Sequence, residues 1–209
     1  MAHPVILGFD TSGHHCAAAL RWGDDNVAHV FEDMAKGQAE RLMPLLQELL
    51  DQEGFDWADL DAVAVGIGPG NFTGIRIGVS AARGLALGLN IPAIGVSTFE
   101  LVRGANSTQD QHPQFVSVPA PRTTSYLQSF ENGQASSAPK HLTFENMQTH
   151  LNETIPVIGL DGELTDIPQT IVRIATHKFA AKQFTPPAPL YVRAADAAPP
   201  RDALPTILP

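Results

Sequence analysis

The sequence predicts an α/β fold made of two lobes. Three short apolar segments near the amino terminus are spaced as in a β-meander, and residues 61–96 follow the order strand, glycine-rich turn, helix, strand. A polar stretch rich in Ser, Thr and Gln at residues 106–112 indicates a connection between lobes. We therefore expect a first lobe over residues 1–104 and a smaller, divergent second lobe with a tail over residues 105–209.

The first lobe is expected to open with three antiparallel strands. Residues 5–9 form an apolar strand that ends in a turn beginning with Asp10, Thr11 and Ser12, and residues 16–20 and 27–31 follow as two further strands. A meander with a carboxylate at its first turn is the layout of the actin, Hsp70 and sugar-kinase class of ATPases, where this turn reaches toward phosphate and magnesium. We favour the other interpretation, in which Asp10 accepts hydrogen bonds from backbone amides of its own turn.

Residues 38–53 predict an amphipathic helix whose apolar stripe consists of Leu42, Leu45, Leu46, Leu49 and Leu50. The ordinary role of such a stripe is packing in the protein's own core. Because Met43 and the edge formed by Leu46 and Leu50 widen the apolar face, contact with another protein is a second interpretation.

The segment 61–96 contains the most distinctive motif of the chain. Residues 62–65 are expected to form a buried strand, Gly68 and Gly70 to form part of a tight turn, and Asn71 to cap a helix over residues 72–89. A short strand over residues 94–96 follows the helix.

Three interpretations of this glycine-rich turn remain open. Its glycines could simply supply the backbone freedom of a tight turn. The helix amino terminus could bind an anion, with further donors from Thr73 and Arg76. The small residues Gly74, Gly78 and Ala81 could instead let a partner approach the helix closely.

Composition excludes several classes of protein. Acidic residues outnumber basic residues by 22 to 13, so the net charge is −9, and without a basic cluster a free-standing nucleic-acid binder is disfavoured. The single cysteine, Cys16, excludes an intramolecular disulfide. No apolar run is long enough to span a bilayer and no signal segment is evident, so we expect a cytoplasmic protein that does not contact membranes.

The second half is less regular. Strands are predicted over residues 115–118, 125–130 and 155–160, and a helix over residues 170–183. Prolines end this helix, and the tail from residue 194 is expected to be extended or mobile.

Four stretches resemble the TsaB (YeaZ) family, which takes part in making threonylcarbamoyladenosine in bacterial tRNA. They are FDTS at residues 9–12, GQAERLMPLL at 37–46, the segment from GIGPGNFTGIRIG to STFELV at 66–102, and PLYVRAADAAPP at 189–200. The resemblance implies an actin/Hsp70/sugar-kinase-like fold with a shortened second lobe. It also implies a non-catalytic scaffold or activating subunit that pairs with the paralogous catalytic subunit TsaD.

The resemblance further implies where partners and ligands bind. This subunit would need no cofactor, whereas ATP and a metal are expected at the partner. A TsaE-like ATPase would join the complex, tRNA would bind only through the complex, and the chain alone would form a homodimer. The partner interface would include Leu42, Leu46, Leu50, Gly74, Gly78 and Ala81. Apart from the resemblance, the two turns themselves suggest a phosphate-turn-like, vestigial site that consists of Asp10, Thr11, Ser12, Gly68, Gly70, Thr73 and Arg76.

Catalytic residues and metal ligands are not expected in this chain. The catalytic paralogue carries a His-x-x-x-His pair on the helix that follows the strand matching residues 94–96, and this spacing places two imidazoles on one helix face. The matching positions here are Thr98 and Val102, which cannot supply imidazoles. The alternative function is a small-molecule kinase or ATPase of the same fold, which would need a second phosphate-binding turn and acidic metal ligands in the cleft.

Overall fold

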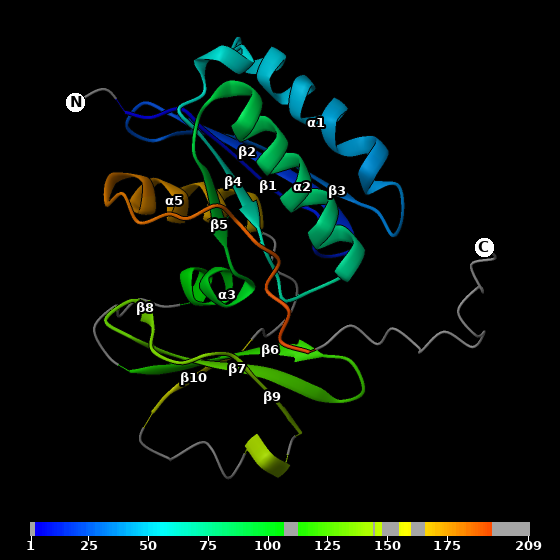
Figure 1. The fold of residues 1–209 in the computed structure, drawn as a ribbon, viewed down its shortest axis with the longest axis vertical. Coiled ribbons are helices and arrows are strands. Elements are labelled where there is room, and N and C mark those ends of the chain that lie inside the picture. Colours follow the sequence, from blue (N-terminus) through cyan, green and yellow to red (C-terminus); the bar gives the residue numbers. More distant parts are fainter. Residues whose placement is uncertain (1–2, 107–112, 144, 148–154, 160–165, 194–209) are drawn as a thin grey trace, which may run out of the picture.

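A mixed sheet forms the first lobe (Figure 1). In the computed structural model, which describes residues 3–106, 113–143, 145–147, 155–159 and 166–193, the strand order of this sheet is β3-β2-β1-β4-β5. The first three strands are antiparallel neighbours, and β4 and β5 run parallel to β1. The predicted meander and strand-turn-helix-strand unit are confirmed. The strands are β1 (Ile6–Asp10), β2 (His15–Trp22), β3 (Asn26–Asp33), β4 (Ala62–Gly66) and β5 (Ala93–Val96).

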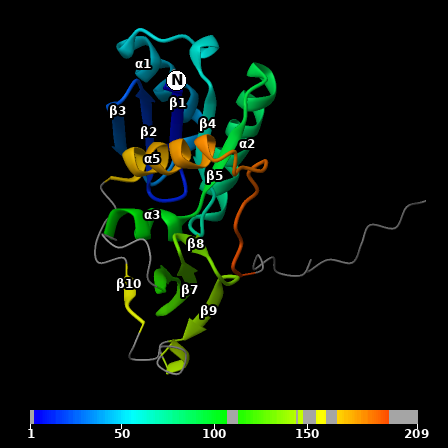
Figure 2. The ribbon, with the colours of Figure 1, turned by 90° about the vertical axis from the view of Figure 1, so that its left-hand side faces the viewer.

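Helices cover both faces of this sheet (Figures 1 and 2). α1 (Gln38–Glu53) and α2 (Phe72–Leu89), joined through η1 (Trp57–Asp59) and β4, pack on one face, and α5 (Ile167–Ala180) packs on the other. Strand residues alternate between the faces, so Leu7 and Phe9 join the core under α1 and α2 whereas Ile6 joins the core under α5. The bounds of α1 and α2 agree with the predicted helices.

α5 returns to the first lobe from the second half of the chain. Chain order alone predicts this helix in the second lobe. In the structure Ile171 and Val172 are fully buried against the first sheet, where both would clash with a Cβ atom added at Gly8. The parallel part of the sheet needs cover on both faces, and α5 supplies the cover that α1 and α2 leave open. The division of the chain at residue 104 stays a prediction.

A second sheet lies beyond α3 (Figure 1). Its order is β10-β6-β7-β8, with β9 paired to β7, and α3 (Thr98–Asn106) packs against its inner face through Phe99 and Val102. The linker predicted at 106–112, apart from Asn106, and the tail from residue 194 lie outside the described residues. Among the described helices, none combines the length and apolar character needed to cross a membrane. The strands are β6 (Gln114–Ala120), β7 (Thr124–Glu131), β8 (Gln134–Ala135), β9 (Lys140–Thr143) and β10 (Val157–Gly159).

Arg41 on α1 forms ion pairs with the sheet and within its own helix. The Arg41 guanidinium contacts Glu32 on β3 at 2.7 and 2.8 Å and Glu48 on α1 at 2.6 and 2.7 Å. These hydrogen bonds hold the pKa of both carboxyls below the ordinary value of 4.5. The ion pairs therefore add stability above pH 4.5, and this contribution is lost as the pH falls through the lowered pKa values.

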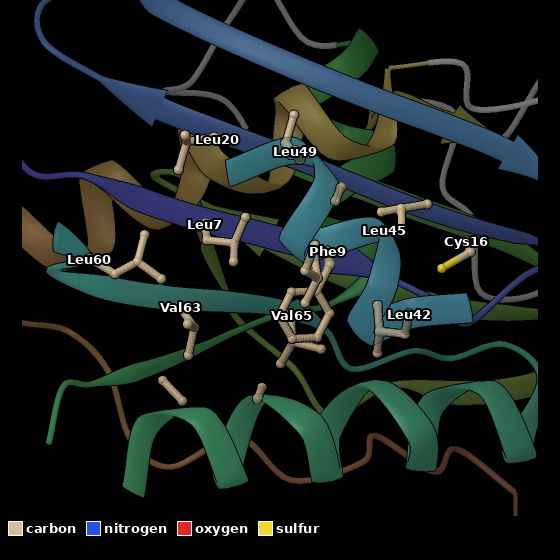
Figure 3. Close-up of a cluster of buried hydrophobic side chains, with 14 of the residues drawn as sticks. Leu7, Phe9, Cys16, Leu20, Leu42, Leu45, Leu49, Leu60, Val63 and Val65 are labelled. Carbon is tan, nitrogen blue, oxygen red and sulfur yellow. The ribbon is translucent and has the colours of Figure 1, made fainter. Parts of the chain in front are cut away.

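The leucine stripe of α1 lies in the core (Figure 3). Leu42, Leu45 and Leu49 belong to the same buried cluster as Leu7, Phe9 and other apolar side chains of the sheet. The exposed fractions of Leu42, Leu46 and Leu50 are 1%, 0% and 0%. Their assignment to a partner interface is therefore wrong for the side chains themselves, because the sheet of the same chain already buries the whole stripe.

Replacing Leu46 with Ala is expected to lower the free energy of unfolding by about 2–5 kcal/mol, because the truncation leaves a cavity in the core. Urea unfolding followed by circular dichroism measures the change. Met43→Ala on the same helix is the control, since Met43 is 42% exposed, and should change the free energy by less than about 0.5 kcal/mol. Equal effects of the two substitutions would contradict the burial of Leu46.

Candidate functional site

The first turn of the meander packs directly onto the start of α2. The Thr11 hydroxyl donates a buried hydrogen bond of 2.7 Å to the Gly74 carbonyl, and the Asn71 amide donates one of 2.7 Å to the Ser12 carbonyl. The structure thus brings Thr11, Ser12 and Gly70 of the predicted phosphate-turn-like site close together, beside Gly74 of the predicted interface, and a phosphate role of this turn stays a prediction.

Asp10 is held by its own turn. Its carboxylate is 1% exposed and accepts hydrogen bonds from the Ser12 amide and, at 3.0 Å, from the Ser12 hydroxyl. The favoured interpretation of Asp10 as a turn carboxylate is confirmed by these bonds. On its other side, the backbone of Gly66 lies so close that an added Cβ atom would stand 2.2 Å from Asp10 Oδ2.

The amino terminus of α2 is capped by the chain itself. Asn71 Oδ1 accepts hydrogen bonds from the amides of Thr73 at 2.9 Å and Gly74 at 3.1 Å, which confirms Asn71 as the N-cap. The preceding Gly68–Pro69 peptide bond is cis, and the Gly68 carbonyl accepts a hydrogen bond from the Thr98 amide. The amides that would bind an anion at this terminus therefore already have an acceptor.

Close backbone contact explains the glycines at the start of α2. A Cβ atom would lie 2.5 Å from the Ser12 carbonyl oxygen at Gly70, 1.8 Å from the Thr11 carbonyl oxygen at Gly74, and 2.9 Å from the Thr11 hydroxyl at Gly78. A Cβ contact under 3.0 Å is not tolerated in real structures. Of the three open interpretations, the tight turn and close packing within this chain accounts for Gly70, Gly74 and Gly78.

The other predicted phosphate donors point elsewhere. Arg76 is exposed, and its Nε donates a 2.8 Å hydrogen bond to the Tyr191 hydroxyl. Thr73 is exposed and lines a small pocket of about 340 Å³, together with Lys36 and Gly37 at the start of α1. The phosphate role of these residues stays a prediction.

The accessible surface of α2 differs from the interface predicted. Gly74 and Gly78 are buried against Thr11, so they are not free to contact a partner, whereas Ala81 is half-buried beside them. The exposed apolar side chain is Leu87, with an exposed fraction of 85%. Leu87 is not among the interface residues predicted from the sequence, although its position off the apolar stripe of the helix indicates an exposed side chain. We define the outer face of α2 as its exposed residues Gly84, Leu87 and Gly88.

Thr98 and Val102, the positions that the resemblance matches to the histidine pair of the catalytic paralogue, both make contacts within this chain. Thr98 donates a 2.8 Å hydrogen bond from its hydroxyl to the Pro69 carbonyl, and Val102 is fully buried in the core of the second lobe. Within the part of the chain that the structure describes, no three His, Cys, Asp or Glu side chains are grouped so that they could hold a metal ion.

Comparison with sequences places the chain near proteins of tRNA modification. A sequence model of the family "TsaD: tRNA N6-adenosine threonylcarbamoyltransferase" matches residues 30–161, more than half of the 209 residues. The chain is 45% identical over 93 residues to "tRNA threonylcarbamoyladenosine biosynthesis protein TsaB" of Escherichia coli (strain K12) and 38% identical over 96 residues to the Bacillus subtilis (strain 168) protein of that name. These matches cover 44% and 46% of this chain, and they span only 40% and 42% of the relatives' length.

Comparison with solved structures shows the fold. A Pseudomonas aeruginosa protein described as uncharacterized with similarity to the peptidase YeaZ superimposes with a TM-score of 0.74 at 22% identity, covering 91% of this chain and 100% of that chain. YeaZ from Pseudomonas aeruginosa gives a TM-score of 0.68 at 20% identity, covering 88% and 95%. The predicted actin/Hsp70/sugar-kinase-like fold with a shortened second lobe is confirmed.

The surroundings of Gly74 and Gly84 predict opposite effects of alanine substitutions on stability. Gly74→Ala is expected to destabilise the protein by about 1–3 kcal/mol or to prevent folding, because the methyl group overlaps the Thr11 carbonyl. Gly84→Ala, where a Cβ atom meets nothing within 4 Å, should stabilise it by about 0.4–1 kcal/mol. Thermal unfolding of both variants measures the difference, and a Gly74→Ala variant as stable as Gly84→Ala would refute the packing described.

Proposed function

Because this chain belongs to the TsaD family and, within it, to the TsaB (YeaZ) proteins, we propose that it is a non-catalytic scaffold or activating subunit in the synthesis of tRNA N6-threonylcarbamoyladenosine. The main observation in support of the proposal is that α3 has no histidine at positions 98 and 102. Thr98 and Val102 are the places where the resemblance puts the metal-binding histidines of the catalytic paralogue, and both side chains are used for packing.

The proposed partner is a TsaD-like catalytic subunit. Support comes from the outer face of α2, where Leu87 is exposed and Gly84 and Gly88 have no side chains that would keep a second helix from packing closely. Met43, on α1 of the same face of the sheet, is a further exposed apolar side chain, with an exposed fraction of 42%. The same surface would form the homodimer when the chain is alone, so homodimer and heterodimer would compete.

Other ligands are assigned to the rest of the complex. ATP and a metal would bind at the TsaD-like subunit, and a TsaE-like ATPase would complete the assembly. tRNA would bind through the complex, because a chain with a net charge of −9 repels the phosphate backbone.

The alternative of a small-molecule kinase or ATPase is not favoured. Asn71 caps the amides of Thr73 and Gly74, and Arg76 is hydrogen-bonded to Tyr191. Few hydrogen-bond donors of the first-lobe turn are therefore left to bind a phosphate, as such an enzyme would require.

Reconstitution tests the proposal. The purified chain alone is expected neither to hydrolyse ATP appreciably nor to form threonylcarbamoyladenosine, and addition of TsaD-like and TsaE-like subunits should produce the modified nucleoside in tRNA. Product formation is measured by chromatography of digested tRNA, with the mixture lacking this chain as control. Robust turnover by the chain alone, or equal product without it, would contradict the assigned role.

A charged substitution on the outer face of α2 tests the partner surface. Leu87→Glu is expected to weaken binding to the TsaD-like subunit by about tenfold or more, the scale of an interface residue worth over 1 kcal/mol, and to weaken the homodimer as well. Calorimetric titration and light scattering measure the two affinities. Val157→Glu, at a 41% exposed apolar residue of the second sheet, is the matched control. If Leu87→Glu folds and keeps both affinities, the outer face of α2 is not the interface.

A further inference from the structure

The segment that follows α5 connects the two lobes. Residues 184–193, which we name the strap, leave the end of α5 and run alongside the first lobe to the second sheet, as the orange trace in Figures 1 and 2 shows. At its start, the Phe184 ring stacks on Phe179 of α5 with ring centres 6.1 Å apart, and Pro187 is buried next to Gly95. The strap is therefore anchored on the first lobe before it reaches the second.

Alternate residues of the strap then serve different lobes. Leu190 and Val192 pack against the core of the second lobe, which contains Phe99 and Phe130. Tyr191 lies between them in sequence and faces α2 instead. Because successive side chains of an extended segment point to opposite sides, three consecutive residues contact both lobes.

Tyr191 makes a specific set of contacts with the first two turns of α2. Its ring is stacked on Phe72 with centres 4.5 Å apart and an angle of 10° between the planes. Its hydroxyl accepts the 2.8 Å hydrogen bond from Arg76, whose guanidinium carbon lies 5.7 Å from the Tyr191 ring centre and 5.8 Å from that of Phe72. The neighbouring Leu190 amide donates to the Ile67 carbonyl at 2.8 Å, at the turn before α2.

We propose that residues 189–192 form a latch that couples the orientation of the second lobe to the amino-terminal turns of α2. The lobes are also joined by the chain between β5 and α3 and by the packing of α3 on α5, where Leu101 lies in the core under α5 and Glu100 pairs with Lys178 at 2.6 Å. Because α2 packs on the opposite face of the sheet from α5, the latch adds an attachment away from this contact and restricts rotation of the second lobe about it. Tyr191 is 40% exposed, so its contacts can open without unfolding either core.

The latch holds for the isolated chain whatever its biological role. If the proposed function holds, the latch also links the second lobe to the partner surface. Phe72 and Arg76 belong to the helix whose outer face is the proposed partner surface, so a partner that repositions α2 would also shift the second lobe through Tyr191.

Distance measurements between spin labels test the latch. Labels are placed on Gln52→Cys in α1 and Lys140→Cys in β9, both exposed positions, in a Cys16→Ala background. We expect Tyr191→Ala to broaden or shift the interlobe distance distribution, and Tyr191→Phe, which keeps the ring stack, to remain close to the parent. Exchange of the Leu190 amide should become about two- to tenfold faster in Tyr191→Ala, as expected for the loss of one aromatic pair.

Two further variants make the result decisive. Phe72→Ala removes the same ring stack from the first-lobe side and must broaden the distribution in the same way, so the proposal stays testable if Tyr191→Ala does not fold. Phe31→Ala, which removes a ring of similar exposure (39%) from β3, should leave the distribution unchanged. A distribution that is unchanged in folded Tyr191→Ala and Phe72→Ala, or equally broadened in Phe31→Ala, overturns the latch.

Discussion

The close approach of the first meander turn to α2 is the contact on which the rest of the first lobe depends. Two backbone segments meet there without a side chain between them, because a Cβ atom at Gly74 would lie only 1.8 Å from the Thr11 carbonyl oxygen. The Thr11 hydroxyl donates a hydrogen bond to the Gly74 carbonyl, and the Asn71 amide donates one to the Ser12 carbonyl. This contact sets the height of α2 over the sheet. It therefore also sets how α1 and α2 share that face, and where Leu87 emerges at the surface.

The same contact changes what the turn can do chemically. In a phosphate-binding turn the helix amides and nearby cations remain open to an anion. Here the Asn71 side chain caps the Thr73 amide, the Asp10 carboxylate accepts a hydrogen bond from the Ser12 amide, and Arg76 donates one to the Tyr191 hydroxyl. These groups are therefore engaged within the chain, where they hold the first meander turn against α2 and Tyr191 against the start of that helix.

Much of the fold could be predicted from the sequence. The bounds of α1 and α2 followed from helical periodicity, the Asn71 cap and the glycine turn, because these signals are local along the chain. The capping bond of Asn71 and the turn bond of Asp10 were anticipated for the same reason. The predictions that failed concern which side of an element faces solvent: Leu46 was expected at an exposed edge and is fully buried, and Gly74 was expected to face a partner and faces Thr11.

The sequence by itself determined the order of elements in the first lobe, the two-lobed α/β class and the lack of imidazoles at positions 98 and 102, since each of these depends on residue type and spacing alone. Only the tertiary structure decided that α5 covers the first sheet, that Leu87 is the exposed leucine of α2, and that Tyr191 meets Arg76 across 115 residues of sequence. These features depend on which surfaces meet in space. An apolar stripe on a helix predicts that this side of the helix is buried, but the surface that buries it depends on the packing of the whole chain.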